Sequence, residues 1–503
     1  MERIKCPQRN SPWIYNAACM KFGRREFLKW ASFAAGGLCA SSNLSWALPQ
    51  KAEERYGNGK RIAVLGAGLA GLAAGLELRR TGHDVTILEA QLHPGGRVHT
   101  IREGLSDDLY AEAGAARIPA THNVTLGWVK YFGLELEPFR PKDLAEIALL
   151  KGKRVKIPAD KPLDMSLVPL DLTSNERKIG LTNLEEHYFG ASARQIGERI
   201  RDDWPAIARF GDISIRDFLQ QRGASEDAIH YLLLGWDDNA AADWLKDVLN
   251  HNAAPLTKVR GGNDKLPRAF AAKLSDVIRY GCAVEHIERG EKGVRVAYRR
   301  AGMLEHVDAD AAICTIPYGV LRHIAVTPEW SSGKRKVIDN LYYGPAVRTT
   351  YQVRYRYWED DGLNGFGMSD KDFEVWHPTW ATPVRRGLLQ AYNYENYARE
   401  LDQLNENERI ERIIGDMEEV LPGLRANLET VVSKSWANDP FERGAYTVYH
   451  VGQMEWYHDI CRPEGRVWFA GEHASPLPGW MEGAIASGIR AVQEIKAEFH
   501  RAA

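Results

Sequence analysis

Residues 61–90 read RIAVLGAGLAGLAAGLELRRTGHDVTILEA, which predicts a strand, a glycine-rich turn, a helix and a second strand. Residues 62–65 form an apolar run of the kind found in buried parallel strands. Gly66, Gly68 and Gly71 then follow the G-x-G-x-x-G spacing, which permits a tight turn, close approach of a pyrophosphate and packing of the helix on the strand. The unit therefore predicts a dinucleotide-binding βαβ fold with phosphates at the start of its helix.

An acidic residue ends the second strand of this unit. Glu89 lies 18 residues after Gly71, where a carboxylate can accept hydrogen bonds from both ribose hydroxyls and would repel a 2′-phosphate. The fingerprint alone fits either FAD or NAD. Residues expected to line the nucleotide site within the unit are Gly66, Gly68, Leu69, Ala70, Gly71, Glu89 and Ala90.

The composition is that of an ordinary globular protein. The chain has 503 residues, of which 44% are hydrophobic and 26% charged, so we expect two or three domains. A net charge of −2 gives no reason to expect nucleic-acid binding. Three cysteines lie in the first 47 residues, and the others, without C-x-x-C spacing, are expected to be free thiols rather than metal ligands: Cys282, Cys314 and Cys461.

The N-terminal segment has the features of an export signal. Residues 1–47 contain a twin-arginine motif around Arg24 and Arg25, a short apolar stretch at 30–38 and Ser45-Trp46-Ala47, which suits a signal peptidase. We expect a periplasmic or secreted protein, exported folded by the twin-arginine export machinery. No stretch approaches about 20 apolar residues, so no stable membrane insertion is expected.

Beyond the first unit, the pattern changes several times along the chain. Residues 163–252 are helical and locally polar, and residues 345–357 alternate in a way that predicts a half-exposed strand of an antiparallel sheet. A strand at 467–470 and a long helix at 479–499 return to the pattern of a nucleotide-binding fold. The domains are therefore expected to be interleaved.

Several further blocks occur in a fixed order. They are GGR at 95–97, GAARIP at 114–119, RGGNDKLP at 260–267, TIPYGVL at 315–321, FAGEH at 469–473 and GWMEGAIASGIRA at 479–491. With GAGLAGL at 66–72, this series resembles the flavin-containing amine oxidase family, and is most similar to its L-amino acid oxidase branch. Another flavoprotein with two dinucleotide-binding motifs, such as a phytoene desaturase, is the alternative.

The resemblance implies an α/β fold. A Rossmann-like FAD-binding domain of the two-dinucleotide-binding type would be interleaved with an α+β substrate domain that has an antiparallel sheet and a helical insert. The expected division is 57–117, 254–320 and 460–503 for the FAD-binding domain, 118–160 and 321–459 for the substrate-binding domain, and 161–253 for the helical insert.

The resemblance also implies a set of FAD contacts. Arg97 would offer its guanidinium to the pyrophosphate or the flavin edge, Val284 its backbone to the adenine, and Glu472 its carboxylate to the ribityl-diphosphate. Trp436 would pack on the flavin, or else be ordinary core. Because no cysteine follows GEH, we expect noncovalent FAD. The remaining implied cofactor-binding residues are Gly96, Gly114, Ala115, Ala116, Arg117, Gly479, Trp480, Met481, Glu482, Gly483 and Ala484.

For the substrate, the resemblance implies a clamp on an α-carboxylate. Arg117 and Tyr392 would hold the carboxylate, while the backbone of Gly479 and Trp480 would lie near the amino group. Arg117 has two other readings, a salt bridge with Glu112 or a flavin contact only, and Tyr392 has one, a core tyrosine. Trp480 is also a candidate catalytic residue.

One position departs from the family pattern. The family usually has a lysine, bonded through water to flavin N5, ten residues before an aromatic-Trp pair that matches Trp358 here. That position is Arg348, which cannot readily give up a proton and is no simple replacement. We treat Arg348 as a catalytic candidate whose effect on the oxygen reaction is open.

The predicted activity is oxidative deamination of L-amino acids by dioxygen, giving 2-oxo acids, ammonia and hydrogen peroxide. The alternatives are an oxidase of primary amines or polyamines, and an amino-acid dehydrogenase of the same fold with a non-oxygen acceptor. Acidic residues at 237, 238 and 243 either favour a basic side chain or form a solvated acidic face. His93, His99 and His473 are expected to be structural, and the oligomeric state stays open, with a homodimer as one option.

Overall fold

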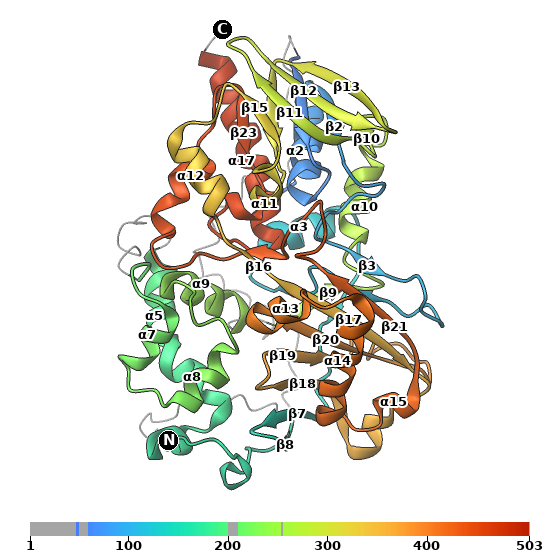
Figure 1. Ribbon diagram of the computed structural model, residues 1–503, viewed down its shortest axis with the longest axis vertical. Coiled ribbons are helices and arrows are strands. Elements are labelled where there is room, and N and C mark those ends of the chain that lie inside the picture. The colour runs from blue at the N-terminus through green and yellow to red at the C-terminus, as the bar shows by residue number, and fades with distance from the viewer. Residues whose placement is uncertain (1–46, 50–58, 200–209, 253–254, 502–503) are drawn as a thin grey trace, which may run out of the picture.

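The computed structural model describes residues 47–49, 59–199, 210–252 and 255–501 (Figure 1). The twin-arginine motif lies outside the described residues, so the structure does not bear on it. Ala47, the residue before the expected cleavage point, is buried, and its carbonyl oxygen accepts a 3.0 Å hydrogen bond from Nε1 of Trp128. Among the described residues, no helix has the length and apolar character needed to cross a bilayer.

A parallel sheet forms the centre of the nucleotide-binding part. Its strands follow the order β10–β2–β1–β14–β23, and every neighbouring pair is parallel. Helices α2 and α17 pack against each other beside this sheet, in the upper half of Figure 1. The bounds are β1 Arg61–Leu65, α2 Leu69–Arg80, β2 Asp84–Leu88, β10 Ile278–Arg279, β14 Ala311–Cys314, β23 Val467–Phe469 and α17 Met481–Arg501.

A second, mostly antiparallel sheet lies next to it in the order β13–β12–β11–β15. Strand β15 pairs with β11 through residues 325–327, whereas the division expected from the sequence assigns these residues to the substrate-binding domain. The bounds are β11 Ala283–Arg289, β12 Val294–Arg300, β13 Met303–Ala309, α11 Tyr318–Leu321, β15 Ala325–Thr327 and α12 Ser332–Asn340.

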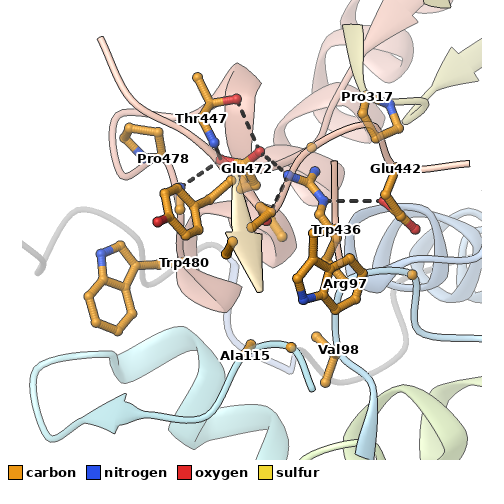
Figure 2. Close-up of a pocket in the computed structure, with 18 of the residues that line it drawn as sticks. Arg97, Val98, Ala115, Pro317, Trp436, Glu442, Thr447, Glu472, Pro478 and Trp480 are labelled. Carbon is orange, nitrogen blue, oxygen red and sulfur yellow. Dashed lines mark hydrogen bonds and ion pairs between the residues drawn. The ribbon is translucent and has the colours of Figure 1, made fainter. Parts of the chain in front are cut away.

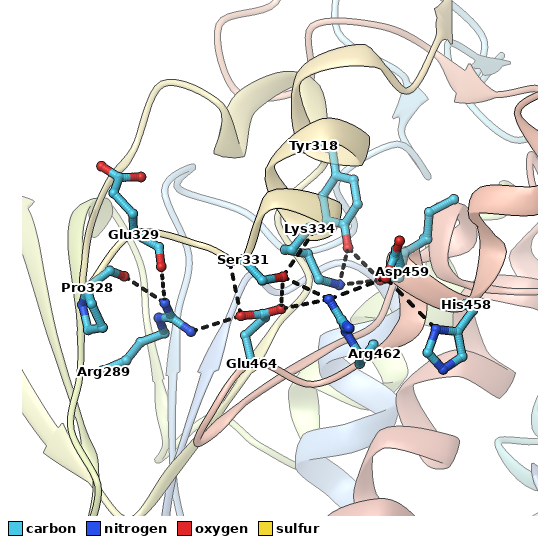
Figure 3. Close-up of polar contacts among 11 residues, drawn as sticks. Arg289, Tyr318, Pro328, Glu329, Ser331, Lys334, His458, Asp459, Arg462 and Glu464 are labelled. Atoms are coloured by element: carbon cyan, nitrogen blue, oxygen red, sulfur yellow. Dashed lines mark hydrogen bonds and ion pairs between the residues drawn. The ribbon is translucent and has the colours of Figure 1, made fainter.

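Buried polar groups tie α12 to the segment before β23 (Figure 3). Glu464 accepts a 2.6 Å hydrogen bond from the hydroxyl of Ser331 and pairs with Arg289 at 3.2 Å. Beside them, Nζ of the fully buried Lys334 donates to the carbonyl oxygen of Ile460 at 2.8 Å. These contacts join parts of the chain more than 120 residues apart.

The other large sheet carries the far wall of the molecule's main cavity. Its strands follow the order β21–β17–β20–β19–β18–β7–β8, with β18 and β7 parallel and the other pairs antiparallel. The bounds are β7 Ala145–Leu150, β8 Lys153–Ile157, β17 Ala346–Val353, β18 Leu363–Ser369, β19 Phe373–Trp376, β20 Gly387–Tyr394 and β21 Leu428–Ser435.

Strand β17 corrects one expectation from the sequence. The alternation at 345–357 predicts a half-exposed strand, yet every residue of β17 is buried. Val347 and Tyr351 pack on one face in a cluster with helices α13 Glu395–Leu401 and α14 Glu406–Val420. On the other face, Arg348 donates to the backbone of Glu112 and Gln352 accepts from the backbone of Ser106, so a polar pattern here marks a buried polar layer.

The helical insert lies between β8 and β9, at the lower left of Figure 1. Within residues 163–252, predicted to be helical, Gly180 adopts φ 84° and separates α4 from α5. The insert contains α4 Ser174–Ile179, α5 Leu184–Arg199, α7 Ile215–Gln220, α8 Glu226–Leu233 and α9 Ala241–Asn252.

Short elements complete the frame around the cavity. Strand β9 joins β5 and β6 in a small antiparallel sheet. The bounds are β3 Thr100–Ile101, β4 Ala111–Glu112, β5 Ile118–Pro119, α3 Asn123–Tyr131, β6 Leu136–Pro138, β9 Leu256–Val259, α10 Lys265–Ala272, β16 Tyr343–Gly344, α15 Leu424–Asn427, β22 Tyr446–Thr447 and α16 Tyr457–Cys461.

Candidate active site

A cavity of about 650 Å³ extends from the carboxyl ends of β1 and β2 to strands β17 and β20. Ligands of open α/β sheets bind at such strand ends. Residues from both ends of the sequence line it, including Gly68 after β1 and Gly479 before α17. The cavity is therefore assembled only when the distant segments of the fold come together.

The three glycines after β1 fit a nucleotide pyrophosphate. Gly66 has φ 113°, and a Cβ on Gly71 would lie 2.0 Å from the carbonyl oxygen of Gly66, so both positions are needed to close the turn on the helix. A Cβ on Gly68 would meet no protein atom within 4 Å, which means that this position faces the open cavity. Since the first N–H groups of a helix lack intrahelical partners, the start of α2 presents donors to an anion there.

Glu89 lines the cavity at the end of β2. Its carboxylate accepts hydrogen bonds from the backbone N–H groups of Ala67 at 2.6 Å and Gln91 at 2.8 Å. Burial raises the pKa of Glu89, which these amides oppose. A carboxylate has about four acceptor positions, so capacity for ribose hydroxyls remains. Val284 and Ala90, two other residues predicted for the nucleotide, also line the cavity.

Arg97 lies between two carboxylates (Figure 2). Its Nη1 is 2.6 Å from Oε1 of Glu472, and its Nε is 3.4 Å from Oε2 of Glu442. Glu472 also accepts from the backbone N–H of Gly479 at 2.6 Å and from the hydroxyl of Thr447 at 3.3 Å. The predicted Arg97 and Glu472 are thus brought together, each at the cavity wall.

Glu442 is a cavity residue that no sequence motif singles out. It is buried and lies beside the GGR turn, since a Cβ on Gly96 would be 3.3 Å from its Oε1. Burial raises the pKa of Glu442 to about 8, although the charge of Arg97 opposes the shift. No motif marks Glu442, which stands in the unremarkable stretch DPFERGAY.

The start of α17 forms another wall. Gly479, Trp480, Met481 and Ala484 line the cavity, and Nε1 of Trp480 donates to Asp247 at 2.6 Å. The side chain of Glu482 is directed elsewhere: it accepts from the backbone N–H groups of Val124 and Thr125 and caps helix α3. Gly483 is likewise a packing position, since a Cβ there would lie 2.1 Å from the carbonyl oxygen of Leu477.

Trp436 lies against the backbone of the GAARIP block. Its Nε1 donates to the carbonyl oxygen of Ala113 at 2.7 Å, and its ring lines the cavity with Ala115 and Ala116. The bond fixes the indole, and the ring still faces the space where a planar group would pack. A Cβ on Gly114 would lie 1.9 Å from the carbonyl oxygen of Arg97, so the block runs closely beside the GGR turn.

The end of the cavity at the mixed sheet is cationic and aromatic. Arg348 on β17 is opposite Tyr392 on β20, which is in turn opposite Glu374 on β19. The Cζ atom of Arg348 lies 4.1 Å from the ring centre of Tyr392 and 4.5 Å from that of Trp376. These residues, apart from Trp376, line the cavity.

Arg117 reaches the same end of the cavity. Its Nη1 lies 3.8 Å from Oε2 of Glu374, and its guanidinium is 5.2 Å from the ring centre of Trp376. The salt bridge with Glu112 considered from the sequence is not formed: Glu112 accepts from Thr100 and from the backbone of Asn263. Burial raises the pKa of Glu112 to about 7.

The helical insert contributes carboxylates to the cavity mouth. Asp243 is buried, pairs with Lys246 at 3.0 Å and accepts from the backbone of Tyr449, so it is no part of a solvated acidic face. Asp237 pairs with Arg216 at 2.7 Å. Glu185 and Asp247 line the cavity, and burial together with Asp247 raises the pKa of Glu185 to about 7.

The histidines and cysteines form no metal centre in the described part of the chain. The rings of His93 and His99 have their centres 5.2 Å apart and are tilted by 34°, and His473 is buried against Tyr318. Cys282, Cys314 and Cys461 are free thiols, of which Cys461 is only partly buried.

Comparisons with known proteins identify the family of the chain. The family described as flavin containing amine oxidoreductase matches residues 69–496. The chain is 32% identical to "Putative L-amino-acid oxidase YobN" of Bacillus subtilis (strain 168), over 87% of this chain and 94% of that protein. It is 29% identical to the flavin-dependent L-tryptophan oxidase RebO of Lentzea aerocolonigenes, over 87% of this chain and 98% of that protein.

Solved structures share the fold. A triple mutant of putrescine oxidase matches with a TM-score of 0.74 at 20% identity, covering 88% of this chain and 99% of that one. Cyclohexylamine oxidase from Brevibacterium oxydans IH-35A matches with a TM-score of 0.73 at 19% identity, covering 88% of this chain and all of that one. The chain belongs to the flavin-containing amine oxidoreductase family, and its cofactor is FAD.

Proposed function

We propose that the protein is an L-amino acid oxidase that converts an amino acid, dioxygen and water to a 2-oxo acid, ammonia and hydrogen peroxide. Bound FAD supplies the acceptor for the hydride that leaves Cα. The neutral amine is the reacting form, because an ammonium has no lone pair to stabilise the developing positive charge. Activity should therefore rise with pH through the pKa of the bound amine.

The charge at the aromatic end of the cavity carries this proposal. This group of lining residues contains two guanidinium groups, of Arg117 and Arg348, and one carboxylate, of Glu374, which lies 3.8 Å from Arg117. A surplus positive charge in a buried site attracts the α-carboxylate of an amino acid and repels an ammonium group on the substrate. The hydroxyl of Tyr392 is 3.3 Å from that of Tyr446 and can rotate to donate a hydrogen bond to the α-carboxylate of the substrate.

The remaining lining groups suit the reaction. We assign the backbone of Gly479 and Trp480 to the amino group, because Gly479 is fixed by its bond to Glu472 and adjoins the open cavity. The rings of Trp376, Tyr392 and Trp436 are each at most 5% exposed and exclude water from the neighbourhood of the substrate. Water exclusion strengthens the charge interactions that orient Cα.

An oxidase of primary amines or polyamines is the second candidate, since Glu185 and Asp247 face the cavity mouth and would attract a cationic chain. Peroxide release under air, measured with an amino-acid panel and with the matching decarboxylated amines, separates the two. We expect turnover of amino acids and little of amines. Equal or faster turnover of the amines would reject the proposal.

The electron acceptor is dioxygen in an oxidase and another carrier in a dehydrogenase. Anaerobic bleaching of the flavin by an amino acid, followed by mixing with oxygen, separates an oxidase from a dehydrogenase. We expect rapid recolouring and stoichiometric peroxide. Slow recolouring with oxygen and fast recolouring with an artificial acceptor would indicate the dehydrogenase.

We also propose that residues 1–47 direct export of the folded protein by the twin-arginine route. The motif at Arg24 and Arg25 supports this proposal. Replacing both arginines with lysine should retain the protein in the cytoplasm with FAD bound, as measured by cell fractionation. An unchanged distribution would contradict the route.

A further inference from the structure

Arg348 has an unusual environment for a buried cation. The residue is 7% exposed, and the rings of Tyr392 and Trp376 lie within 4.5 Å of its Cζ. Aromatic faces attract a guanidinium, but they carry no net charge that would neutralise it. Arginine also keeps its proton under all ordinary conditions, so this charge is permanent.

No carboxylate in the described part of the chain pairs with Arg348 within 4.0 Å. Its one hydrogen bond runs from Nη1 to the backbone oxygen of Glu112 at 3.3 Å. Glu374, the acidic group in the same cross-strand row, is engaged otherwise: its Oε2 accepts from Nε1 of Trp376 at 2.8 Å and lies 3.8 Å from Arg117. Within the described residues, the other guanidinium N–H donors have no hydrogen-bond acceptor, and the side chain lines the cavity.

An unpaired buried charge is costly for the folded protein. By comparison, Arg140 also lines the cavity, but it pairs with Glu146 at 3.1 Å and is largely in contact with solvent. Since Arg348 opens on the cavity, an anion bound there would neutralise it and recover much of that cost.

We infer that Arg348 supplies the charge that selects carboxylate-bearing substrates, and that the site prefers amino acids with an uncharged side chain. This inference rests on the proposed function. Arg117 and Arg348 against Glu374 leave one positive charge, and an amino acid with a neutral amine and a neutral side chain brings one negative charge. An acidic side chain would leave a negative charge in the buried site, and a basic one a positive charge.

The test is a binding titration of the FAD-loaded enzyme. Binding is measured as the change in flavin absorbance. Benzoate is the anionic probe and benzamide its neutral match. The variants are Arg348→Met, Arg348→Lys and Glu374→Gln, with Arg140→Met as the matched control in the same cavity. Retained FAD and a cooperative melting transition no lower than that of the wild type show that each variant is folded.

We expect Arg348→Met to weaken benzoate binding by about 10-fold or more, the usual effect of losing a charge-assisted hydrogen bond, and to leave benzamide unchanged. Arg348→Lys should recover part of the affinity, and Arg140→Met should change it less than about twofold, as exposed pairs do. Benzoate affinity within threefold of wild type in Arg348→Met would overturn the inference.

Glu374→Gln keeps the test decisive if Arg348→Met does not fold. It adds a second surplus charge, so benzoate should bind at least threefold more tightly, and turnover of L-aspartate relative to L-leucine should rise. Unchanged affinity and unchanged preference would overturn the inference. If the wild-type enzyme binds benzoate no better than benzamide, the proposed function itself fails. If the wild-type enzyme discriminates and the variants discriminate equally well, only the role of Arg348 is wrong.

Discussion

Arg348 and Tyr392 are directly opposite each other in the β17–β20 ladder, with the guanidinium carbon 4.1 Å from the centre of the phenol ring. The pair joins a charge, an aromatic surface and a hydroxyl in one wall of the cavity. Because both residues belong to buried strands, their positions are fixed before any ligand binds.

Tyr392→Phe should separate the hydroxyl from the ring. The ring would still cover Arg348, while the hydroxyl contact to Tyr446 and any bond to the substrate carboxylate would be lost. We expect KM for L-amino acids to rise by about tenfold, as for a hydrogen bond to a charged group, with little change in melting temperature. Unchanged KM would place the hydroxyl outside the substrate site.

The glycine turn predicts two different defects. Gly68→Ala adds a methyl group toward the cavity and should fold normally but bind FAD about tenfold more weakly or worse, which corresponds to roughly 1.4 kcal/mol. Gly71→Ala places its Cβ 2.0 Å from the carbonyl oxygen of Gly66 and should lower the free energy of unfolding by about 1–3 kcal/mol. Flavin titration and apoprotein denaturation measure the two effects. Equal stability loss in both variants would contradict this assignment.

We expect Glu442 to make the stability of the apoprotein depend on pH. Burial raises its pKa from 4.5 to about 8, with Glu89 and Asp439 adding to the shift and Arg97 and Lys434 opposing it. The folded state thus binds more protons than the unfolded state between these values, and stability is lost as pH rises through about 8. Glu442→Gln, which stays neutral, should remove this loss in denaturation at pH 6 and 9. An identical pH slope in both proteins would refute the assignment.

We expect Lys334 to make stability change with pH in the opposite direction. Burial lowers its pKa from 10.5 to about 7, so the unfolded state binds more protons in this window and stability rises as pH increases. Lys334→Met should be more stable below pH 7 by about 1–4 kcal/mol, as when apolar side chains replace buried charges. The carbonyl oxygen of Ile460 keeps its 2.7 Å bond from Tyr318 (Figure 3).

The gain from Lys334→Met should fade toward pH 10, where the lysine is neutral in the folded protein. Lys336→Met on the exposed side of the same helix is the matched control and should show no such dependence. Urea denaturation at pH 6, 8 and 10 provides the measurement. A gain that stays constant with pH would show that packing, not charge, is responsible.

The sequence predicts the nucleotide-binding unit closely, because its signals are local. Strand β2, Asp84–Leu88, ends directly before Glu89, where the sequence predicts the end of the second strand. Strand β1 begins one residue before the apolar run at 62–65. Gly71 is constrained by the carbonyl oxygen of Gly66, which lies only five residues earlier in the chain. Such contacts leave a regular spacing in the sequence.

The cavity wall is less predictable, because it depends on strand pairing between distant residues. Glu374 has no motif around it and becomes part of the site only by lying opposite Tyr392. Glu442 lies beside Gly96 of the GGR turn, although the two residues are more than 340 positions apart in the sequence. The burial of β17 likewise depends on α14 and on Glu112, which the alternation along β17 does not reveal.

The packing of α2 against α17 has a consequence for synthesis of the chain. Helix α2 is made long before α17, yet the two helices share one apolar cluster. While the ribosome is still translating, the apolar surface that α17 will cover stays open to water or to a chaperone. Synthesis of α17 is therefore the step that closes the cofactor-binding half, so a chain terminated before Met481 should leave this apolar surface uncovered.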